Sequence, residues 1–245
     1  MARFLALVYG GVAYLMFGLT WVYFIGFLGG FPVPKDITAG TPSPVPYAVA
    51  IDLACLAVFF AHHSVMARAR AKRVLARLIP PAIERSTYVL VATLALILVM
   101  ALWRPLPQIA WHAEGAAGVA LTVVFWAGVL VALAAAHLLD GLELFGVRQV
   151  LGYARRRAPA PPTGFRTPAL YRFVRHPMMT GMLVMFWAAP TMDAGRLLLA
   201  VAMTAYILVA VKYLEERDLR RTFGADYERY QRAVPMLLPV RSPKC

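Results

Sequence analysis

Residues 115–139 read GAAGVALTVVFWAGVLVALAAAHLL, an apolar run without any Asp, Glu, Lys or Arg. A helix needs roughly 20 apolar residues to cross the hydrocarbon core of a bilayer, because each residue adds about 1.5 Å along its axis. Helices of soluble domains average about 11–12 residues and are usually apolar on one side only. The run at 115–139 is therefore predicted to be a transmembrane helix.

Further apolar segments lie on both sides of this run. They are Phe4–Leu28, Tyr47–Met66, Thr87–Trp103, Met178–Met192 and Ala194–Tyr213. The segment from Met178 is short, so we expect it to be tilted or to begin earlier, near Pro168. Together the segments predict an all-α, polytopic transmembrane helical bundle of five to six membrane helices, the last two forming a hairpin. A carboxy-terminal region on the cytoplasmic side completes the predicted fold.

The composition agrees with a membrane bundle. Of 245 residues, 61% are hydrophobic and 15% are charged, whereas soluble domains have about 45–50% apolar and 25% charged residues. We expect one domain over residues 1–245, with four membrane helices in 1–139 and a loop, the hairpin and the tail in 140–245. The two cysteines, Cys55 and Cys245, form no zinc or disulfide pattern, and no metal site is predicted.

Positive charge gathers in alternate connections between the apolar segments. The connections on the opposite side contain few basic residues, namely Lys35, Arg104 and Arg196. The basic side carries Arg68, Arg70, Lys72, Arg73, Arg77, Arg85, Arg148, Arg155, Arg156, Arg157, Arg166, Arg172, Arg175 and the basic residues of the tail. Because positive residues mark the cytoplasmic side, both termini are predicted inside, with six crossings in a bacterial inner membrane. Five crossings would require a different assignment of the termini.

The net charge of +13 thus reports topology and contact with the lipid bilayer. No nucleic-acid partner is predicted, because the basic residues lie beside the spans and match no binding module. The sequence leaves the oligomeric state open.

Four ionisable residues lie at the cytoplasmic ends of predicted spans, where their burial is costly and function is the default hypothesis. His62 and His63 end the second span, and His137 and Asp140 end the fourth. Three residues apart on a helix, His137 and Asp140 share a face, and a carboxylate can orient an imidazole as a proton acceptor. A structural hydrogen bond is the alternative for His62 and His63.

The stretch from Arg172 to Gly181 is typical of a helix start. Pro177 suits the first turn, and the backbone donors behind it, with Arg172 and Arg175, predict an anion-binding site. Glu215 and Glu216 follow the last span, where a helix end disfavours carboxylates unless a cation compensates them. Together these groups suit a zwitterionic cofactor with a carboxylate and a cationic centre.

The carboxy-terminal third resembles the membrane superfamily of isoprenylcysteine carboxyl methyltransferases and phospholipid N-methyltransferases. The shared pattern is an Arg-His-Pro followed by a Gly, then a span, Glu-Glu, Phe-Gly with two tyrosines, and two prolines. Here it consists of Arg175, His176, Pro177, Gly181, Glu215, Glu216, Phe223, Gly224, Tyr227, Tyr230, Pro235 and Pro239.

Two further stretches, 62–68 (HHSVMAR) and 137–150 (HLLDGLELFGVRQV), extend the likeness. They resemble the bacterial methanethiol S-methyltransferases, and this resemblance spans nearly the whole chain. The chain is also similar to a denitrification-associated membrane family. Met178 and Met179 replace the aromatic residue found after the proline in many isoprenylcysteine enzymes. This departure favours a small thiol over a protein substrate.

The resemblance implies S-adenosyl-L-methionine as cofactor and methyl transfer to methanethiol, a small volatile thiol, giving dimethyl sulfide at the cytoplasmic face. It implies a cofactor site of Arg172, Arg175, His176, Pro177, Gly181, Glu215, Glu216 and Tyr227. Arg172 or Arg175 would bind the carboxylate and a glutamate the ribose. Thiols ionise near pH 8.5, so a base is expected, either His137 with Asp140 or His62 and His63.

Two alternatives remain at this point. The acceptor is a larger lipid or prenylated cysteine, or the protein is a non-enzymatic, haem-associated membrane protein in which histidines are axial ligands.

Overall fold

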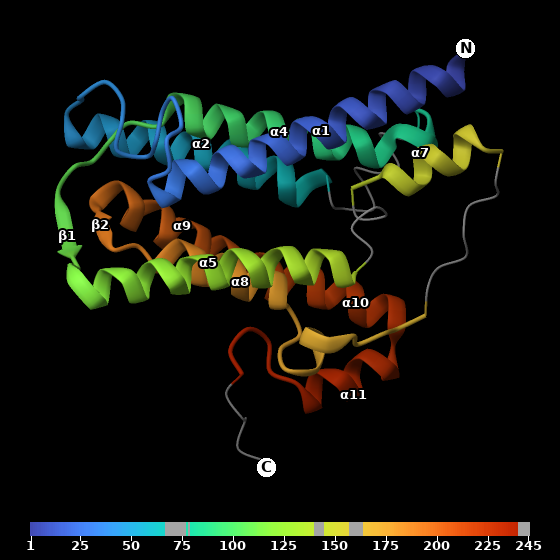
Figure 1. Ribbon diagram of the computed structural model, residues 1–245. Coiled ribbons are helices and arrows are strands. Elements are labelled where there is room, and N and C mark those ends of the chain that lie inside the picture. Colours follow the sequence, from blue (N-terminus) through green and yellow to red (C-terminus); the bar gives the residue numbers. More distant parts are fainter. Residues whose placement is uncertain (67–76, 78, 140–144, 157–163, 240–245) are drawn as a thin grey trace. The chain divides into compact units, whose positions relative to one another are not determined.

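The computed structural model describes residues 1–66, 77, 79–139, 145–156 and 164–239 of the chain (Figure 1). The described elements are α1 (Ala2–Gly29), α2 (Val45–Met66), α4 (Pro81–Leu102), β1 (Ile109–His112), α5 (Gly115–Leu138), α7 (Val147–Ala154), η1 (Ala169–Arg172), α8 (Pro177–Trp187), β2 (Thr191–Asp193), α9 (Ala194–Ala210), η2 (Val211–Glu215), α10 (Glu216–Phe223) and α11 (Ala225–Ala233). The predicted all-α architecture is confirmed.

Five of the described helices are long and apolar enough to cross a membrane: α1, α2, α4, α5 and the continuous helix Ala194–Phe223. The chain is therefore an integral membrane protein, as the sequence predicts. The sixth apolar helix, α8, has 11 residues and is about 16 Å long at 1.5 Å per residue. By itself it is shorter than the roughly 30 Å core of a bilayer.

Several helix boundaries differ from those expected from the sequence, and the last span continues beyond Tyr213 to Phe223. Helix α4 begins at Pro81 rather than Thr87, because Pro81 suits its first turn and Glu84 also lies in that turn. Helix α8 ends at Trp187 rather than near Met192. Pro190 restricts the backbone of the preceding residue, and the chain then becomes extended in β2.

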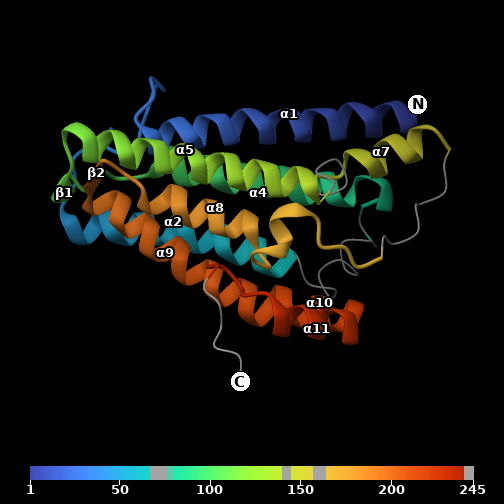
Figure 2. The same ribbon diagram turned by 60° about the horizontal axis from the view of Figure 1, so that its bottom comes forward.

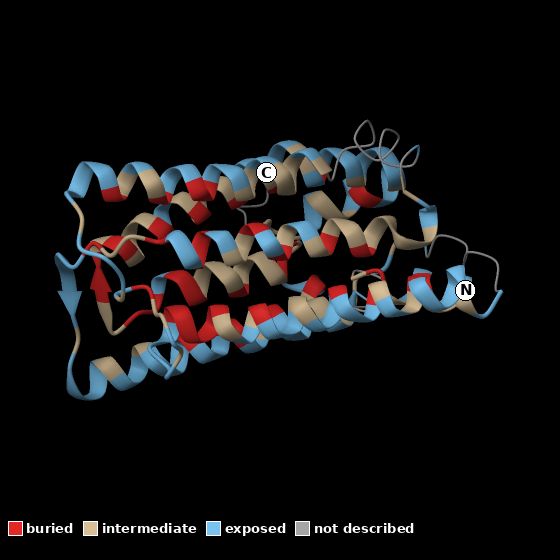
Figure 3. Ribbon diagram, turned by 90° about the horizontal axis from the view of Figure 1, so that it is seen from above, coloured by how far each residue is buried: buried red, intermediate tan, exposed pale blue. Residues whose placement is uncertain are grey.

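Large apolar side chains remain on the outside of the membrane helices. Between 22% and 33% of the most hydrophobic window of each of the five is buried within the protein, and pale-blue positions alternate with red along every long helix in Figure 3. Leu15, Val22, Val119 and Leu130 are each more than 60% exposed. In water such surfaces would drive association, but hydrocarbon solvates them.

Contacts divide the chain into two compact units. The first comprises Met1–Gln108 and Asp140–Pro161, and the second Ile109–Leu139 and Pro162–Cys245. The expected single domain, with its division at residue 139, stays a prediction.

In the first unit, α1 packs on α4 and on α7 (Figure 2). At the far end of α4 the ammonium of Lys35 donates to the carbonyls of Ala101 and Trp103, at 2.7 and 3.0 Å. A helix lacks internal donors for these last carbonyls. Nearby, the fully buried Asp52 accepts the backbone N–H of Arg104 at 2.8 Å. These polar groups therefore terminate α4.

In the second unit, the strands join the start of α5 to the end of the α8 segment. Strand β1 is exposed and β2 largely buried (Figure 3), and they pair antiparallel, with Trp111 opposite Met192. The Trp111 indole also donates to the carbonyl of Ala189 at 3.0 Å. The chain after α8 thus returns, in extended form, to the end at which α5 begins.

Helices α5 and α8 approach each other closely through two glycines. A Cβ atom on Gly128 would lie 2.7 Å from the carbonyl oxygen of Gly181, and one on Gly181 would lie 2.6 Å from the backbone nitrogen of Ala132. Backbone atoms cannot move aside as the end of a flexible side chain can. Small residues are needed here, as in many membrane helix pairs, and this packing positions the start of α8.

We expect Gly128→Ala to separate α5 from α8 and destabilise the protein by about 1–3 kcal/mol, the usual cost of overpacking. Thermal unfolding in detergent micelles, followed by gel filtration, measures the change. Gly18→Ala is the control, because no described heavy atom lies within 4 Å of the added Cβ. Equal stability of the two variants would contradict the assigned packing.

Candidate functional site

The carboxy-terminal tail is held against the segment that leads into α8. The backbone N–H groups of Arg175 and His176 donate to the carbonyls of Pro235 and Met236, at 2.9 and 3.1 Å. The Thr180 hydroxyl donates to the carbonyl of Leu237 at 2.7 Å. The Arg-His-Pro motif and the two prolines of the tail, more than fifty residues apart, therefore meet.

A π-helical turn ends at the Glu-Glu pair. Residues Val211–Glu215 form this turn between α9 and α10 within one continuous helix. Such turns are rare and often occur at functional sites, because the extra residue changes which side chains face a neighbour. Here Glu216 is buried whereas the Glu215 side chain is 46% exposed. The adjacent carboxylates thus have different environments.

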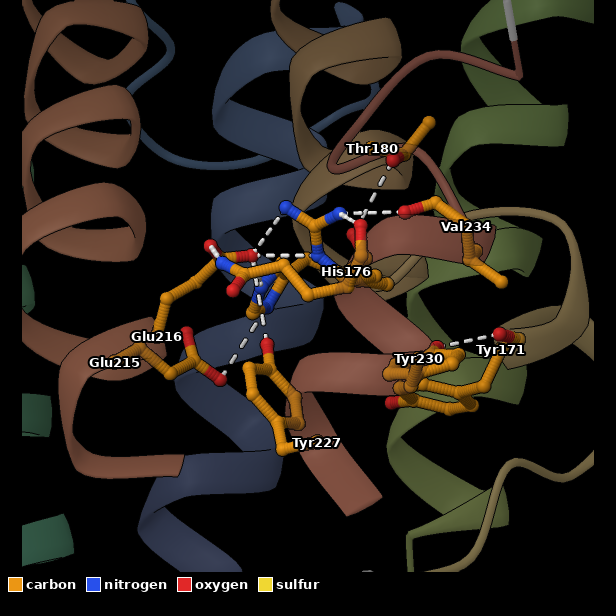
Figure 4. A network of polar contacts seen from close by, with 10 residues as sticks. Tyr171, His176, Thr180, Glu215, Glu216, Tyr227, Tyr230 and Val234 are labelled. Carbon is orange, nitrogen blue, oxygen red and sulfur yellow. Dashed lines mark hydrogen bonds and ion pairs between the residues drawn. The ribbon is translucent and has the colours of Figure 1, made fainter. Parts of the chain in front are cut away.

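The buried carboxylate of Glu216 is the centre of the polar network (Figure 4). Its Oε1 accepts from Arg175 Nε at 2.6 Å, from His176 Nε2 at 3.2 Å and from the Tyr227 hydroxyl at 3.4 Å. Its Oε2 accepts from the side-chain amide of Gln231. A buried carboxylate is tolerated only when it is paired and hydrogen-bonded, and both oxygens meet this condition.

Arg175 also binds the tail. Its Nη1 donates to the carbonyls of Gln231, at 3.0 Å, and Val234, which lie at the end of α11, where carbonyls lack helical donors. The Arg175 side chain is 9% exposed. Arg175 therefore joins the α8 entry, the Glu-Glu helix and the tail, so its donors are engaged by the protein itself.

The ring of His176 lies between the two glutamates. Its Nδ1 is 3.5 Å from Glu215 Oε1, and its Nε2 is 3.2 Å from Glu216 Oε1. Burial favours the neutral ring, but the hydrogen bonds to the two carboxylates outweigh burial and raise the pKa of His176 to about 9. At neutral pH the cluster holds two cations, Arg175 and His176, against two carboxylates, so its charge is balanced.

Aromatic side chains pack beside this cluster. The Phe165 ring lies 5.3, 5.8 and 5.2 Å from those of Phe223, Tyr227 and Tyr230. The Tyr230 hydroxyl donates to the carbonyl of Tyr171, whose own hydroxyl donates to the carbonyl of Ala135 at 3.3 Å. Burial raises the pKa of all three tyrosines, that of Tyr230 to about 12. They therefore act as neutral hydrogen-bond donors linking the tail to α5.

The structure brings together most residues predicted to bind the cofactor. Arg175, His176, Glu215, Glu216 and Tyr227 share the network described above, and Pro177 begins α8. Gly181 faces α5, and Arg172 is exposed at the end of η1. Their individual roles toward a cofactor stay predictions.

The predicted proton acceptors lie in different units. His137 is exposed in the last turn of α5, in the second unit. Asp140 lies outside the described residues. His62 and His63 belong to the first unit, where both contact Tyr88 of α4. Their assignment as bases stays a prediction.

Several residues described here were not recognised from the sequence, among them Gln231, Thr180 and Tyr171 in the second unit and Tyr88 beside the histidines of the first unit. Gln231 directly follows Tyr230 of the carboxy-terminal motif. A single glutamine, however, does not indicate from sequence which side chain it binds. Thr180 lies inside the Arg-His-Pro-to-Gly interval, and Tyr88 lies in an apolar segment. For the residues described, no cluster of three or more His, Cys, Asp or Glu could hold a metal ion.

The fold and the network define a polytopic membrane protein whose Arg-His-Pro and Glu-Glu motifs meet at the entry to a short helix. Residues 53–240 match the NnrU protein family, and the chain belongs to this family.

Several named proteins are similar to the chain in sequence, two of them over nearly its whole length. Methanethiol S-methyltransferase 2 of Bradyrhizobium diazoefficiens is 46% identical, covering 97% of this chain and 91% of the relative. The methanethiol S-methyltransferase of Mycobacterium tuberculosis is 46% identical over 98% of both chains. Nurim of Pan troglodytes is 33% identical, covering 70% of this chain and 68% of its own. No solved structure matches.

We expect Glu216→Gln to destabilise the tail, because Arg175 and His176 would lose their buried counter-charge. Breaking a buried ion pair costs about 3–5 kcal/mol. Thermal unfolding in micelles and the rate of tryptic cleavage in α11 both report this loss. The matched control is Glu228→Gln, which changes an exposed glutamate of α11. Equal cleavage rates of the two variants would contradict the assignment of Glu216 as the centre of the polar network.

The raised pKa of His176 predicts a pH-dependent stability. The unfolded ring titrates near pH 6.5 and the folded ring near 9. Because the folded pKa is the higher one, the stabilisation is complete below about pH 6.5, falls as pH rises and is lost above about 9. The difference in melting temperature between the wild type and His176→Gln should shrink over this window. A constant difference would exclude the charged ring; His112→Gln, in exposed β1, is the control.

Proposed function

We propose that this protein is an S-adenosyl-L-methionine-dependent thiol S-methyltransferase that converts methanethiol to dimethyl sulfide. The observation that supports this most is the 46% identity, over almost the whole chain, to proteins named methanethiol S-methyltransferase. The meeting of the Arg-His-Pro and Glu-Glu motifs around Glu216 provides an independent, structural argument for a ligand site.

The donor set fits the proposed cofactor. Its carboxylate calls for a cation, and Arg172 is exposed at the site's edge. Its ribose hydroxyls and ammonium call for acceptors, and the Glu215 carboxylate is 46% exposed. Its adenine suits an aromatic face, which partly buried Phe165 and Phe223 offer. Since Arg175 and Glu216 are engaged by each other, we assign them to holding the site together rather than to the ligand.

Bound there, S-adenosyl-L-methionine would supply a methyl group on a positively charged sulfur, which a thiolate attacks directly. Glu215 orients the ligand, and the charge-balanced pair of Glu216 and Arg175 keeps the surrounding backbone in place. Holding two reactants in attack geometry contributes about 7–11 kcal/mol to lowering a barrier. Positioning is therefore the main contribution we expect of these residues.

The chain must also accept the thiol proton. A simple thiol is largely protonated at neutral pH, so a base accelerates the reaction roughly 10²–10⁴-fold. The candidates are His137, with Asp140, and the pair His62 and His63. His137 is exposed at the end of α5, two residues beyond the carbonyl that binds Tyr171.

We place the site at the cytoplasmic face of a bacterial inner membrane. The basic connections support this orientation by the positive-inside rule, and the charged cofactor is available only in the cytoplasm. Methanethiol is small and apolar, so it can arrive through the lipid.

The proposal is tested by headspace gas chromatography of purified protein given methanethiol and S-adenosyl-L-methionine. We expect cofactor-dependent dimethyl sulfide from the wild type. Glu215→Gln should raise the KM for the cofactor at least tenfold, because it removes the exposed carboxylate. Glu228→Gln should behave as the wild type. If calorimetry shows that the cofactor binds but no dimethyl sulfide forms, methanethiol is excluded as the acceptor. A prenyl-cysteine analogue or a lipid amine would then be tested as the acceptor.

Variants of the candidate bases complete the experiment. His137→Ala and His63→Ala are compared with His112→Ala, whose ring lies in the exposed strand β1. A haem absorption band in the purified wild type, with no methyl transfer to any acceptor, would instead favour the haem-associated alternative.

A further inference from the structure

Helix α7 lies beside the amino-terminal half of α1, within the first unit (Figure 2). Its side chains divide into two faces. The buried or half-buried positions recur every three or four residues and are Val147, Val150, Leu151 and Ala154. The exposed positions are Arg148, Gln149 and Tyr153, and they are followed by Arg155 and Arg156. Helix α7 is therefore amphipathic, and such helices lie along the surface of a membrane.

Contacts with α1 fix the direction of α7. Val150 packs so closely on Gly10 that a Cβ atom on this glycine would lie 2.8 Å from Cγ2 of Val150. The guanidinium of Arg3 lies over the ring of Tyr153, 5.9 Å from its centre. The residue numbers rise along α7 as they fall along α1, so the two helices run antiparallel. The carboxy-terminal end of α7 therefore lies beside the beginning of α1.

Three exposed arginines are gathered at this end, and we call Arg3, Arg155 and Arg156 the arginine patch. The backbone N–H groups of Arg155 and Arg156 donate to the carbonyls of Leu151 and Tyr153, at 3.0 and 3.3 Å. Arg156 has a φ of 55°, a left-handed conformation that ends the helix. The cation–π contact with Tyr153 holds Arg3 at the same place. The fold of the first unit thus brings the two ends of the patch together from positions 150 residues apart.

Acidic residues of the first unit lie mostly elsewhere. Among the residues that the structure describes there, the acidic ones are Asp36, Asp52 and Glu84. Asp36 and Asp52 lie at the far end of α4, and Glu84 lies in the first turn of α4. Asp140 and Glu143 lie outside the described residues.

Arginines of the carboxy-terminal helices, by contrast, have acidic partners. Arg221 of α10 lies 4.0 Å from Asp218, and Arg229 of α11 is paired with Asp226. Within the described part of the chain, no carboxylate pairs with the arginine patch. The positive charge of the patch is therefore more one-sided, and it attracts anions.

An apolar surface begins directly beside the arginine patch. Phe4, Leu5, Val8 and Val12 of α1 are 67%, 58%, 48% and 48% exposed. In a bilayer, acyl chains cover a surface of this kind. A phospholipid with a negative headgroup has an anionic group and apolar chains in one molecule, so it matches the patch and the adjoining face of α1 together. A free phosphate ion would match only the patch.

We propose that the arginine patch binds the headgroup of an anionic phospholipid whose acyl chains lie along the exposed face of α1. Guanidinium groups bind phosphate oxygens through paired N–H donors. The phenol of Tyr153 is half apolar and half polar, as is typical of side chains between headgroups and acyl chains. This binding site belongs to the first unit, and it is independent of the proposed methyl transfer.

The test titrates the full-length protein in detergent micelles with phosphatidylglycerol or with phosphatidylcholine of the same acyl chains. Native mass spectrometry counts the bound lipids by mass. We expect the wild type to bind phosphatidylglycerol at least tenfold more tightly, because each arginine beside an anionic lipid strengthens binding several-fold. The triple variant Arg3→Gln/Arg155→Gln/Arg156→Gln should lose most of this preference.

A matched control removes the same charge elsewhere. Arg217→Gln/Arg220→Gln/Arg221→Gln changes three exposed arginines of α10, and it should keep the preference for phosphatidylglycerol. The corresponding Arg→Lys triple variant of the arginine patch keeps the charge but lacks the planar guanidinium, so its affinity should fall between those of the wild type and the Gln variant. Melting temperatures in micelles show whether each variant is folded.

A photoreactive phosphatidylglycerol locates the site in the unaltered protein. Cross-linked peptides should come from the amino-terminal half of α1 and from α7. An excess of unlabelled phosphatidylglycerol should abolish the cross-links, whereas inorganic phosphate at the same concentration should not. Competition by inorganic phosphate would identify a simple anion site and overturn the assignment to a lipid.

The remaining outcomes are equally decisive. Equal affinity of the wild type for the two lipids would overturn the proposal, and so would an equal loss of preference in the α10 control. Cross-links confined to α10 and α11 would also contradict it. If the Gln variant of the patch does not fold, the Arg→Lys variant and the cross-linked peptides of the wild type decide the question.

Discussion

A carboxylate buried at the end of a membrane helix must be compensated, and the second unit is organised around that requirement at Glu216. Its two oxygens accept hydrogen bonds from the Arg-His-Pro segment, from Tyr227 and from Gln231. Tyr227 and Gln231 lie in α11, directly after the helix that contains Glu216. The Arg-His-Pro segment lies far from Glu216 in sequence. The charge of one side chain thus determines where the α8 entry and the tail can lie, since any looser arrangement would leave an ion unpaired in a medium that solvates it poorly.

The close approach of α5 and α8 is the second constraint on the position of α8. Glycines at 128 and 181 let two backbones meet where side chains would hold them apart. The π-helical turn after α9 then directs Glu216 inward and leaves Glu215 half-exposed. Two identical neighbouring residues therefore have different environments, one buried in the polar network and one half-exposed.

The histidines also differ in their hydrogen-bond partners. His176 is locked between two carboxylates and is charged at neutral pH, so its raised pKa makes it a poor proton acceptor there. His63 faces a hydroxyl that tolerates either protonation state. The sequence assigned His176 to the predicted cofactor site and His63 to the candidate bases, and the structure gives the two rings different partners.

The amino-acid sequence by itself determined the class of fold. Uninterrupted apolar segments and alternating basic connections predict membrane helices because hydrocarbon demands internally satisfied backbones. It also identified the motif residues that meet at the site, among them Arg175, His176, Glu215, Glu216 and Tyr227. Only the tertiary structure decided which glutamate is buried, that Arg175 binds the tail and that Gln231 takes part. These depend on contacts between residues far apart in the chain, and such contacts arise from packing and from the pairing of buried charge, which no local pattern encodes.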